Sequence, residues 1–240
     1  MNADFYTQQI IVQDFETDAT KRMTPGAILR RAQQISTDHC TRLGIDESLY
    51  QKTHTAFLLA KLAMQIYEPI PAGMQVTITT MPSAPQRAIY HRYTSFCDDA
   101  GKKLCEMDSC WILVNTSNKR ILRVPPQDLP LPFIGEPKKL LDLTIQKAET
   151  EYVAEEKAVY TRCDQNHHLN NTSYADILCD HLPTDLLLNS QPQRLAITYH
   201  KEIPLGQSFQ LSRATLNDKD YYFLGQSAGC KHFEAQFTFR

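Results

Sequence analysis

The sequence lacks the features that mark a nucleic-acid-binding, secreted or membrane-spanning protein. Its 25 lysine and arginine residues are outnumbered by 27 aspartate and glutamate residues, so there is no overall basic excess for binding phosphate backbones. No apolar run approaches the roughly 20 residues that a membrane-spanning helix needs. The first residues contain no basic segment followed by an apolar stretch, so we expect no secretion signal. We therefore expect neither a nucleic acid nor a membrane among the partners.

Disulfide and zinc-binding patterns are missing as well. The seven cysteines are odd in number and scattered, and no pair has the C-x-x-C spacing. This distribution favours free thiols in a reducing compartment, so we expect a cytoplasmic protein. The sequence motifs call for no cofactor and no metal, and none is expected.

The first half has the pattern of one strand, one long helix and several more strands. A strand is predicted over residues 5–15, and Thr24-Pro25 has the N-cap and first-turn proline of a helix that ends before Gly44. Apolar residues recur every three or four positions along this helix, which indicates a single buried face. Four strand-like runs follow, separated by turn residues, over 57–67, 74–80, 87–97 and 104–114.

This order predicts an antiparallel sheet wrapped around a central helix, which is the hot-dog arrangement. The next stretch, 124–139, contains five prolines and no periodicity, so we expect a connector that crosses the surface. The plan of the first half then recurs after this connector. The second half is predicted to contain strand 152–162, helix 171–181 and strands over 195–201, 209–215, 221–228 and 230–239.

A short piece of sequence recurs with the plan. Ile70-Pro71-Ala72-Gly73 and Ile203-Pro204-Leu205-Gly206 each precede a predicted strand, which supports an internal duplication. We therefore predict an α+β fold made of two tandem hot-dog domains. The expected boundaries are an N-terminal domain over 1–124, a linker over 125–145 and a C-terminal domain over 146–240.

The densest reactive chemistry lies between the strand and the helix that open the second half. Asp164, Asn166 and His168 alternate there, so an extended backbone would direct their side chains to one side. The following helix would offer free N–H groups and the positive end of its dipole, which stabilise an oxyanion. Simpler roles, as a helix cap or a solvated side chain, suit three neighbours: Asn170, Asn171 and His167.

Glu202 is a further candidate, since it follows the strand predicted over 195–201. Near His168 it would hold the tautomer of the imidazole ring or deprotonate a water molecule. The alternative is an ordinary surface salt bridge.

These residues resemble the acyl-acyl carrier protein thioesterases of plants and bacteria, which are double hot-dog proteins. Residues 164–174 match the whole family signature, Asp-x-Asn-x-His-x-Asn-Asn-x-x-Tyr. Residues 199–203, Tyr-His-Lys-Glu-Ile, are similar to the family's Tyr-Arg-Arg-Glu-Cys. Residues 109–115, with Lys119-Arg120 after them, are similar to its Ser-x-Trp-x-x-x-Asn and trailing basic pair. The resemblance spans nearly the whole chain in the same order.

The resemblance implies hydrolysis of the thioester that links a fatty acid to acyl carrier protein. The sequence departs from the family at Ile203, where some members have cysteine, and isoleucine cannot attack a thioester. Water is therefore the expected nucleophile. The implied catalytic residues are Asp164, Asn166, His168 and Glu202.

The resemblance also implies where the substrate binds. The acyl chain is expected in the first hot-dog half, in a tunnel walled by the helix from Pro25, the strand over 57–67 and Trp111. The partner is an acidic carrier protein, so a basic landing site is expected. The candidates for this landing site are Lys119, Arg120, Arg123, Lys138 and Lys139.

Three other functions are compatible with the same residues. The first is a thioesterase that acts on coenzyme A esters, and the second is a dehydratase or hydratase with a histidine and an acid at a helix N-terminus. The third is a non-catalytic acyl-binding or metal-binding module, although its potential ligands match no standard zinc spacing: His167, His168, Cys179 and His181. A homodimer is allowed but not required, because two halves of one chain already pair.

Overall fold

The computed structural model describes residues 4–133, 135 and 141–240. The first half contains β1 (Tyr6–Ile11), the short 3₁₀ turn η1 (Asp14–Glu16), α1 (Pro25–Arg42), α2 (Glu47–Thr53), β2 (Thr55–Ile66), β3 (Gln75–Pro82), β4 (Ile89–Cys97) and β5 (Lys103–Asn115). The second half contains β6 (Glu151–Lys157), η2 (Tyr160–Arg162), α3 (Ser173–Asp180), α4 (Thr184–Asn189), β7 (Pro192–Tyr199), β8 (Ser208–Asn217), β9 (Asp220–Ser227) and β10 (Cys230–Phe239).

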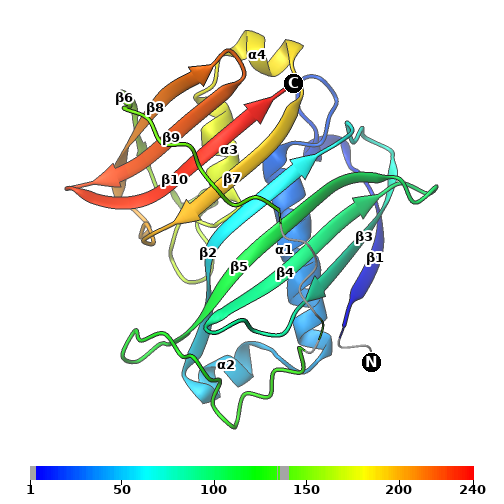
Figure 1. Cartoon of the computed structure of the whole chain (residues 1–240), viewed down its shortest axis with the longest axis vertical. Helices are drawn as coiled ribbons and strands as arrows, with labels where there is room; N and C mark the ends of the chain where they lie inside the picture. The colour runs from blue at the N-terminus through cyan, green and yellow to red at the C-terminus, as the bar shows by residue number, and fades with distance from the viewer. Residues whose placement is uncertain (1–3, 134, 136–140) are drawn as a thin grey trace.

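The strands of both halves form one antiparallel sheet of 10 strands. Their order is β1-β3-β4-β5-β2-β7-β10-β9-β8-β6, so β2 and β7 join the two halves in the middle. Each half contributes the same local order, read outward from this junction, and Figure 1 shows the two sets of strands side by side. The predicted double hot-dog fold is therefore confirmed, with the two sheets continuous.

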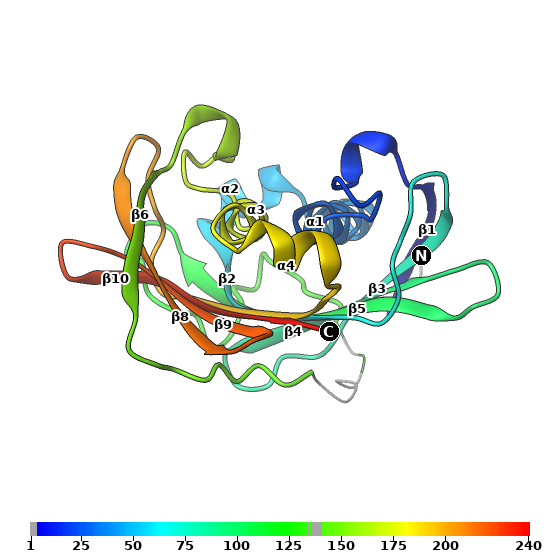
Figure 2. The same cartoon turned by 90° about the horizontal axis from the view of Figure 1, so that it is seen from above.

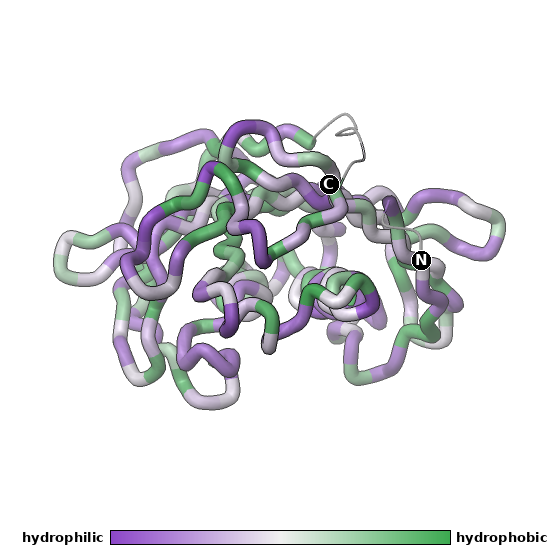
Figure 3. The backbone as a smooth tube through the Cα atoms, turned by 90° about the horizontal axis from the view of Figure 1, so that it is seen from below, coloured by the Kyte–Doolittle hydropathy of each residue, from purple (hydrophilic) through white to green (hydrophobic). Residues whose placement is uncertain are grey.

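The helices lie on the concave face of this sheet. Figure 2 shows α1, α3 and α4 above the strands, while residues 141–150, which lead into β6, run beneath them. Apolar residues from α1, α3 and the inner faces of both sets of strands form one buried cluster. Hydrophobic and hydrophilic residues follow one another at short intervals along the strands (Figure 3). In β3, for example, buried residues alternate with more exposed ones.

Helix α1 begins and ends as its sequence predicts. The Thr24 hydroxyl accepts a hydrogen bond from the Ala27 N–H, and Pro25 occupies the first helical position, where no N–H is needed. Gly44 follows the helix with a φ of 76°, a left-handed conformation that glycine adopts without strain. The predicted apolar face is buried through Ile28, Ala32 and Ile35, and His39 is buried with them.

Several predicted boundaries are wrong. The strand predicted over 152–162 ends at Lys157, because the chain turns into η2 before reaching the second helix. That helix begins at Ser173 rather than Asn171. The strand predicted over 195–201 runs from Pro192 to Tyr199. The short helices α2 and α4 were not predicted, since each has too few turns to show a periodic apolar face.

Gly225 on β9 leaves room for the buried ring of Phe233, which lies opposite it on β10. A Cβ atom on Gly225 would lie 2.0 Å from the Phe233 ring. The corresponding strands of the first half, β4 and β5, place Phe96 opposite Cys105, so the large and small residues are exchanged. Each half thus fills this position of the core with one large residue and one small one.

We expect Gly225→Ala to lower the free energy of unfolding by about 1 to 3 kcal/mol, since the new methyl group overpacks a core that has no space for it. Urea denaturation of Gly225→Ala, Phe233→Leu and the double variant would measure this. The double variant should be more stable than the sum of the single effects predicts. Strictly additive effects would show that the ring and the glycine are not coupled.

Within the described residues, no helix has the length and apolar character needed to cross a membrane.

Candidate active site

The segment that carries the reactive residues is a tight turn, not the extended strand that its alternation predicts. The Asp164 N–H donates to the His168 carbonyl (2.9 Å), and the Asp164 Oδ1 atom accepts from the N–H groups of Asn166 (2.9 Å) and His168 (3.3 Å). His167, at the tip, has a φ of 60°. The short carboxylate of Asp164 offers the backbone a local partner, which favours a turn over an extended segment.

The turn brings His168 against Glu202. The Nε2 atom of His168 lies 3.0 Å from the Oε2 atom of Glu202, and the two side chains are 32% and 46% exposed. Backbone contacts fix the two segments next to each other, since His168 pairs with Pro204 and the Leu169 N–H donates to the Ile203 carbonyl (2.8 Å). The imidazole and the carboxylate therefore form a close pair that water can reach.

Glu202 can approach His168 because it lies in the segment that follows the end of β7. The side chain of His200, just after β7, points away from His168, and its Nε2 atom contacts the Glu234 carboxylate at 2.7 Å. Tyr199, the last residue of β7, points inward and donates its hydroxyl to the Asn171 carbonyl (2.9 Å). Tyr199 also packs edge-on against the ring of Tyr174, the tyrosine that closes the signature.

The remaining signature residues divide between the surface and the interior. The side chain of Asn166 is exposed at the turn, on the same short loop as His168. Tyr174 is buried, and burial together with the negative charges of Asp164 and Glu202 raises the pKa of its hydroxyl. Tyr174 is therefore a neutral core residue beneath the His168–Glu202 pair.

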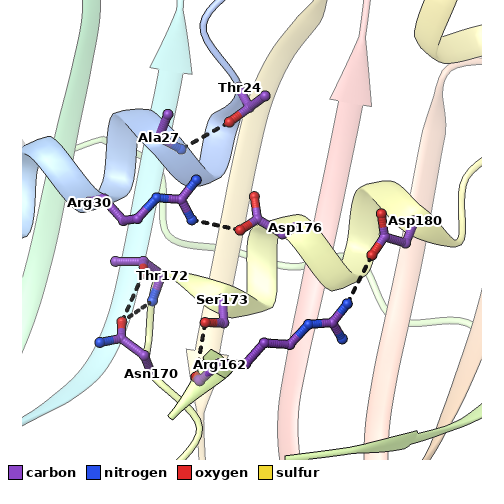
Figure 4. A network of polar contacts seen from close by, with 9 residues as sticks. All are labelled: Thr24, Ala27, Arg30, Arg162, Asn170, Thr172, Ser173, Asp176 and Asp180. Carbon is purple, nitrogen blue, oxygen red and sulfur yellow. Dashed lines mark hydrogen bonds and ion pairs between the residues drawn. The ribbon is translucent and has the colours of Figure 1, made fainter. Parts of the chain in front are cut away.

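The start of α3 is capped differently from the prediction. Asn170 stands before the helix, and its Oδ1 atom accepts from both the N–H and the hydroxyl of Thr172 (Figure 4). The Asn170 carbonyl accepts from the Ser173 N–H. The N-cap position itself belongs to Thr172. Two of the N–H groups expected to stabilise an oxyanion are consequently already occupied by Asn170.

Two ion pairs connect α3 to neighbouring elements. Figure 4 shows Arg30 of α1 reaching Asp176 of α3, with a distance of 2.6 Å between the charged atoms. Arg162 of η2, which precedes the reactive turn, contacts Asp180 at the C-terminal end of α3. Helix α1 of the first half and η2 of the second half are thus both tied to α3.

A small cavity of about 30 Å³ lies between the two halves, next to the start of α3. Its walls come from α1, β2 and β5, including Trp111, as predicted for the acyl-chain tunnel, and sequence reasoning missed Asn171 and Thr172 of the second half. The lining residues are Leu29, Ala32, Gln33, Ser36, Leu59, Leu62, Met107, Ser109, Trp111, Asn171 and Thr172. Asn171 connects this cavity to the signature segment and, through its carbonyl, to Tyr199.

The cysteines near the site are poor nucleophiles. Burial and the adjacent Asp164 carboxylate both raise the pKa of Cys163, and burial raises the pKa of Cys179 to about 12. Ile203 is fully buried and has no reactive group. The geometry therefore favours water over a thiol as the attacking group.

The four potential metal ligands do not converge. His168 contacts Glu202, whereas the Nε2 atom of His181 lies 2.7 Å from Glu156 on a different side of α3. Cys179 packs against the hydrophobic core. Among the described residues, no group of three or more histidine, cysteine, aspartate and glutamate side chains has an arrangement that could hold a metal ion.

The first half contains a copy of the reactive turn. The Asp18 N–H donates to the Arg22 carbonyl (2.8 Å), and the Asp18 Oδ1 atom accepts from the N–H groups of Thr20 (2.8 Å) and Arg22 (3.2 Å). Lys21 has a φ of 61°, as His167 has in the second half. This copy also pairs with the repeated Ile-Pro-x-Gly segment, at Pro71. The duplication inferred from the Ile-Pro-x-Gly segment thus extends to the backbone of the turn.

This register places Arg22 where the second half has His168, and Pro69 where it has Glu202. The Arg22 guanidinium donates to the carbonyls of Ser190 (2.9 Å) and Leu187 (2.8 Å), at the C-terminal end of α4. The copy in the first half therefore has the turn but lacks the imidazole–carboxylate pair. Asp18 shows that an aspartate at this position forms the turn independently of that pair.

We therefore expect Asp164→Ala to reduce turnover and to destabilise the protein by about 1 to 2 kcal/mol, because two backbone N–H groups lose their acceptor. Asp164→Asn should retain most of the turnover and most of the stability, since an asparagine oxygen accepts the same hydrogen bonds. Asp18→Ala is the matched control, expected to lower stability by a similar amount with turnover retained. Equal loss of turnover in Asp164→Asn and Asp164→Ala would instead assign the negative charge a direct role.

The architecture, a helix wrapped by a sheet twice in one chain with a histidine–carboxylate pair near the second helix, defines a double hot-dog protein. Sequence models of the acyl-ACP thioesterase N-terminal and C-terminal domains match residues 3–129 and 145–239. The chain belongs to the acyl-ACP thioesterase family.

Individual relatives are distant in sequence but close in fold. Oleoyl-acyl carrier protein thioesterase 1, chloroplastic, from Arabidopsis thaliana is 22% identical over 218 residues, which cover 82% of this chain and 60% of that protein. A crystal structure of an acyl-ACP thioesterase from Bacteroides thetaiotaomicron superposes with a TM-score of 0.90 at 18% identity, over 100% of both chains. The 12:0-ACP thioesterase from Umbellularia californica gives 0.83 at 16% identity, covering 98% of this chain and 97% of that one. The chain spans about 60% of the length of the first curated relatives that it matches.

Proposed function

We propose that this protein hydrolyses the thioester of fatty acyl-acyl carrier protein, releasing a free fatty acid and ending chain elongation. The observation that carries the proposal is the 3.0 Å contact between His168 and Glu202, in a chain that belongs to the acyl-ACP thioesterase family. An exposed pair of this kind can activate water against a bound carbonyl carbon, and Asn171, three residues after His168, lines the cavity.

In the proposed mechanism, Glu202 together with His168 removes a proton from a water molecule. The resulting hydroxide adds to the thioester carbonyl carbon and forms a tetrahedral oxyanion. The carbon–sulfur bond then breaks, and the proton held by the pair passes to the departing thiolate. The products are a fatty acid and the free thiol of the carrier, so no oxidant or cofactor is consumed.

The oxyanion needs a hydrogen-bond donor, and the Asn166 side chain is our candidate. It is exposed two residues from His168 on the same turn, whereas Thr172 and Ser173 already donate their N–H groups to Asn170. Asp164 orients the turn through the N–H groups of Asn166 and His168. A preformed donor of this type typically contributes about 100- to 1,000-fold to turnover.

We assign acyl-chain binding to the first half, over 1–124, and the chemistry to the second, over 146–240. The cavity supports this division, because its apolar walls come from α1, β2 and β5 while Asn171 and Thr172 form the side toward the signature. A volume of about 30 Å³ holds roughly one water molecule, so α1 and the sheet must separate to admit an acyl chain.

The carrier protein is acidic and would dock on basic residues. Lys119, Arg120 and Arg123 are candidates, since Lys119 and Arg120 are exposed after β5. Lys138 and Lys139 lie outside the described residues. The described cysteines are free thiols, which supports a reducing compartment such as the cytoplasm. His168 and Glu202 belong to one chain, so the pair forms without a residue from a second copy.

The decisive test is to incubate the purified protein with acyl chains of several lengths, linked either to acyl carrier protein or to coenzyme A. We expect free thiol and fatty acid to be released, with a higher kcat/KM for the carrier-linked substrate. Preference for the coenzyme A esters would identify an acyl-CoA thioesterase instead. Conversion of an enoyl or hydroxyacyl thioester without thiol release would identify a hydratase or dehydratase.

A further inference from the structure

A polar cluster centred on one buried histidine lies beside the backbone that leads into Glu202. It consists of His232 on β10, Ser227 on β9 and Gln207 before β8, and His232 is only 1% exposed. The Nε2 atom of His232 lies 2.6 Å from the Ser227 hydroxyl and 3.3 Å from the Gln207 amide nitrogen. Its Nδ1 atom lies 3.2 Å from the Lys201 carbonyl. Because a carbonyl can only accept, Nδ1 carries the proton and Nε2 accepts from the Ser227 hydroxyl, whose oxygen accepts from the Gln207 amide at 2.9 Å.

Through this bond and its backbone, His232 holds the two residues before Glu202. The N–H groups of His200 and Lys201 both donate to the His232 carbonyl, at 2.8 and 3.1 Å. The pairing of β10 with β9 shifts at this point, between Lys231 and Phe233, which is the signature of a bulge. Bulges often redirect a side chain, and here the bulged residue is His232, whose ring contacts the Lys201 carbonyl.

The first half shows which part of this arrangement the fold requires. There the N–H groups of Tyr67 and Glu68 donate to the Leu104 carbonyl, at 2.8 and 3.1 Å, so Leu104 corresponds to His232. The residue after the repeated Ile-Pro-x-Gly segment is Met74, where the second half has Gln207. Leu104 and Met74 both pack in the hydrophobic core. The same backbone therefore forms around apolar residues, and the polar cluster is absent from this place in the first half.

The residue after this backbone contact explains why only the second half has the polar cluster. Pro69 stands in the first half where the second half has Glu202, and its ring fixes the backbone φ angle by itself. Glu202 has no such constraint and must still direct its carboxylate at His168. Burying polar groups is unfavourable unless they are fully hydrogen-bonded, so a polar cluster confined to the half with the reactive pair calls for a reason beyond folding.

We propose that His232 is a positioning residue for the thioester hydrolysis proposed above, and that Ser227 and Gln207 support it. Its Nδ1–H bond to the Lys201 carbonyl fixes the course of the backbone after β7. The carboxylate of Glu202 is thereby directed at the Nε2 atom of His168. His232 does not contact the substrate and acts only through Glu202.

His232→Leu tests this proposal, because the first half folds with leucine at the same place. We expect kcat to fall by about 10- to 100-fold with KM little changed, since a misdirected carboxylate weakens the chemical step rather than binding. His232→Asn, which keeps a donor near the Nδ1 position, should recover most of the activity. His232→Gln, which keeps a polar atom near Nε2 instead, should not. His200→Gln is the matched control on the outer side of the same chain end, and its turnover should stay near wild type.

A second measurement does not depend on turnover. The ring ¹⁵N resonances of His168 report its contact with Glu202, and in His232→Leu they should move toward those of Glu202→Gln. If wild-type protein hydrolyses no acyl thioester, the proposed function fails, while these resonances still test the positioning. Wild-type kcat and unchanged His168 resonances in His232→Leu would overturn the proposal. If His232→Leu does not fold, equal activity of the asparagine and glutamine variants would overturn it.

Discussion

Glu202→Gln is expected to lower kcat on acyl-carrier thioesters by about 100- to 10,000-fold, the usual contribution of a general base. Glutamine has nearly the size of glutamate and can still contact His168, but it cannot take a proton from water. The side chain is 46% exposed, so the substitution should change the free energy of unfolding by less than about 0.5 kcal/mol. Single-turnover measurements with saturating substrate would separate the chemical step from binding.

Glu155→Gln is the matched control for Glu202→Gln. Glu155 is an exposed glutamate of β6, on the edge strand of the second half and outside the reactive turn. It should have wild-type turnover. An undiminished kcat in Glu202→Gln would remove Glu202 from the mechanism, and the remaining candidate bases would be His168 and Asp164.

His168→Ala is the second variant with a large expected effect, again about 100- to 10,000-fold in kcat. The substitution removes the ring that contacts Glu202 but keeps the His168 N–H and carbonyl, which hold the turn through Asp164. The fold should therefore survive. Turnover of the purified variant and its circular dichroism spectrum would check both statements.

The adjacent histidine provides the control. His167 is exposed and adopts a φ of 60°, so asparagine is the suitable replacement because it tolerates this conformation. His167→Asn should retain activity. A loss in His167→Asn as large as that in His168→Ala would mean that the turn, rather than the imidazole of His168, is what the activity requires.

Combining the two variants tests whether the pair acts as a unit. If Glu202 and His168 activate the same water molecule, the double variant should be about as slow as the slower single variant. Multiplicative losses would indicate two independent contributions. In that case Glu202 and His168 would act at different steps of the reaction.

The reactive turn shows which part of the site could be predicted from the sequence. Alternation of Asp164, Asn166 and His168 predicted an extended segment, and that prediction is wrong. Alternation describes only the spacing of side chains, whereas the turn forms because the Asp164 carboxylate accepts backbone N–H groups two and four residues ahead. Comparing this segment with residues 17–23, which contain Asp18 in the same position, would have provided the missing signal.

The polar cluster around His232 was missed for a related reason. Its members come from β9, β10 and the segment before β8, and no local pattern connects them. Aligning the two halves beyond the Ile-Pro-x-Gly segment would have placed His232 opposite Leu104. A buried histidine in one repeat and a leucine in the other is a contrast that only the duplication makes visible.

The sequence by itself determined the elements whose cause is local. Thr24, Pro25 and Gly44 set the ends of α1, apolar periodicity set its buried face, and the signature over 164–174 identified the family resemblance. Only the tertiary structure decided that the two sheets continue through β2 and β7, and that Glu202 meets His168 across 34 positions of sequence. Hydrogen bonding within a helix or turn depends on neighbours in the chain, whereas pairing between distant segments depends on how the whole core packs.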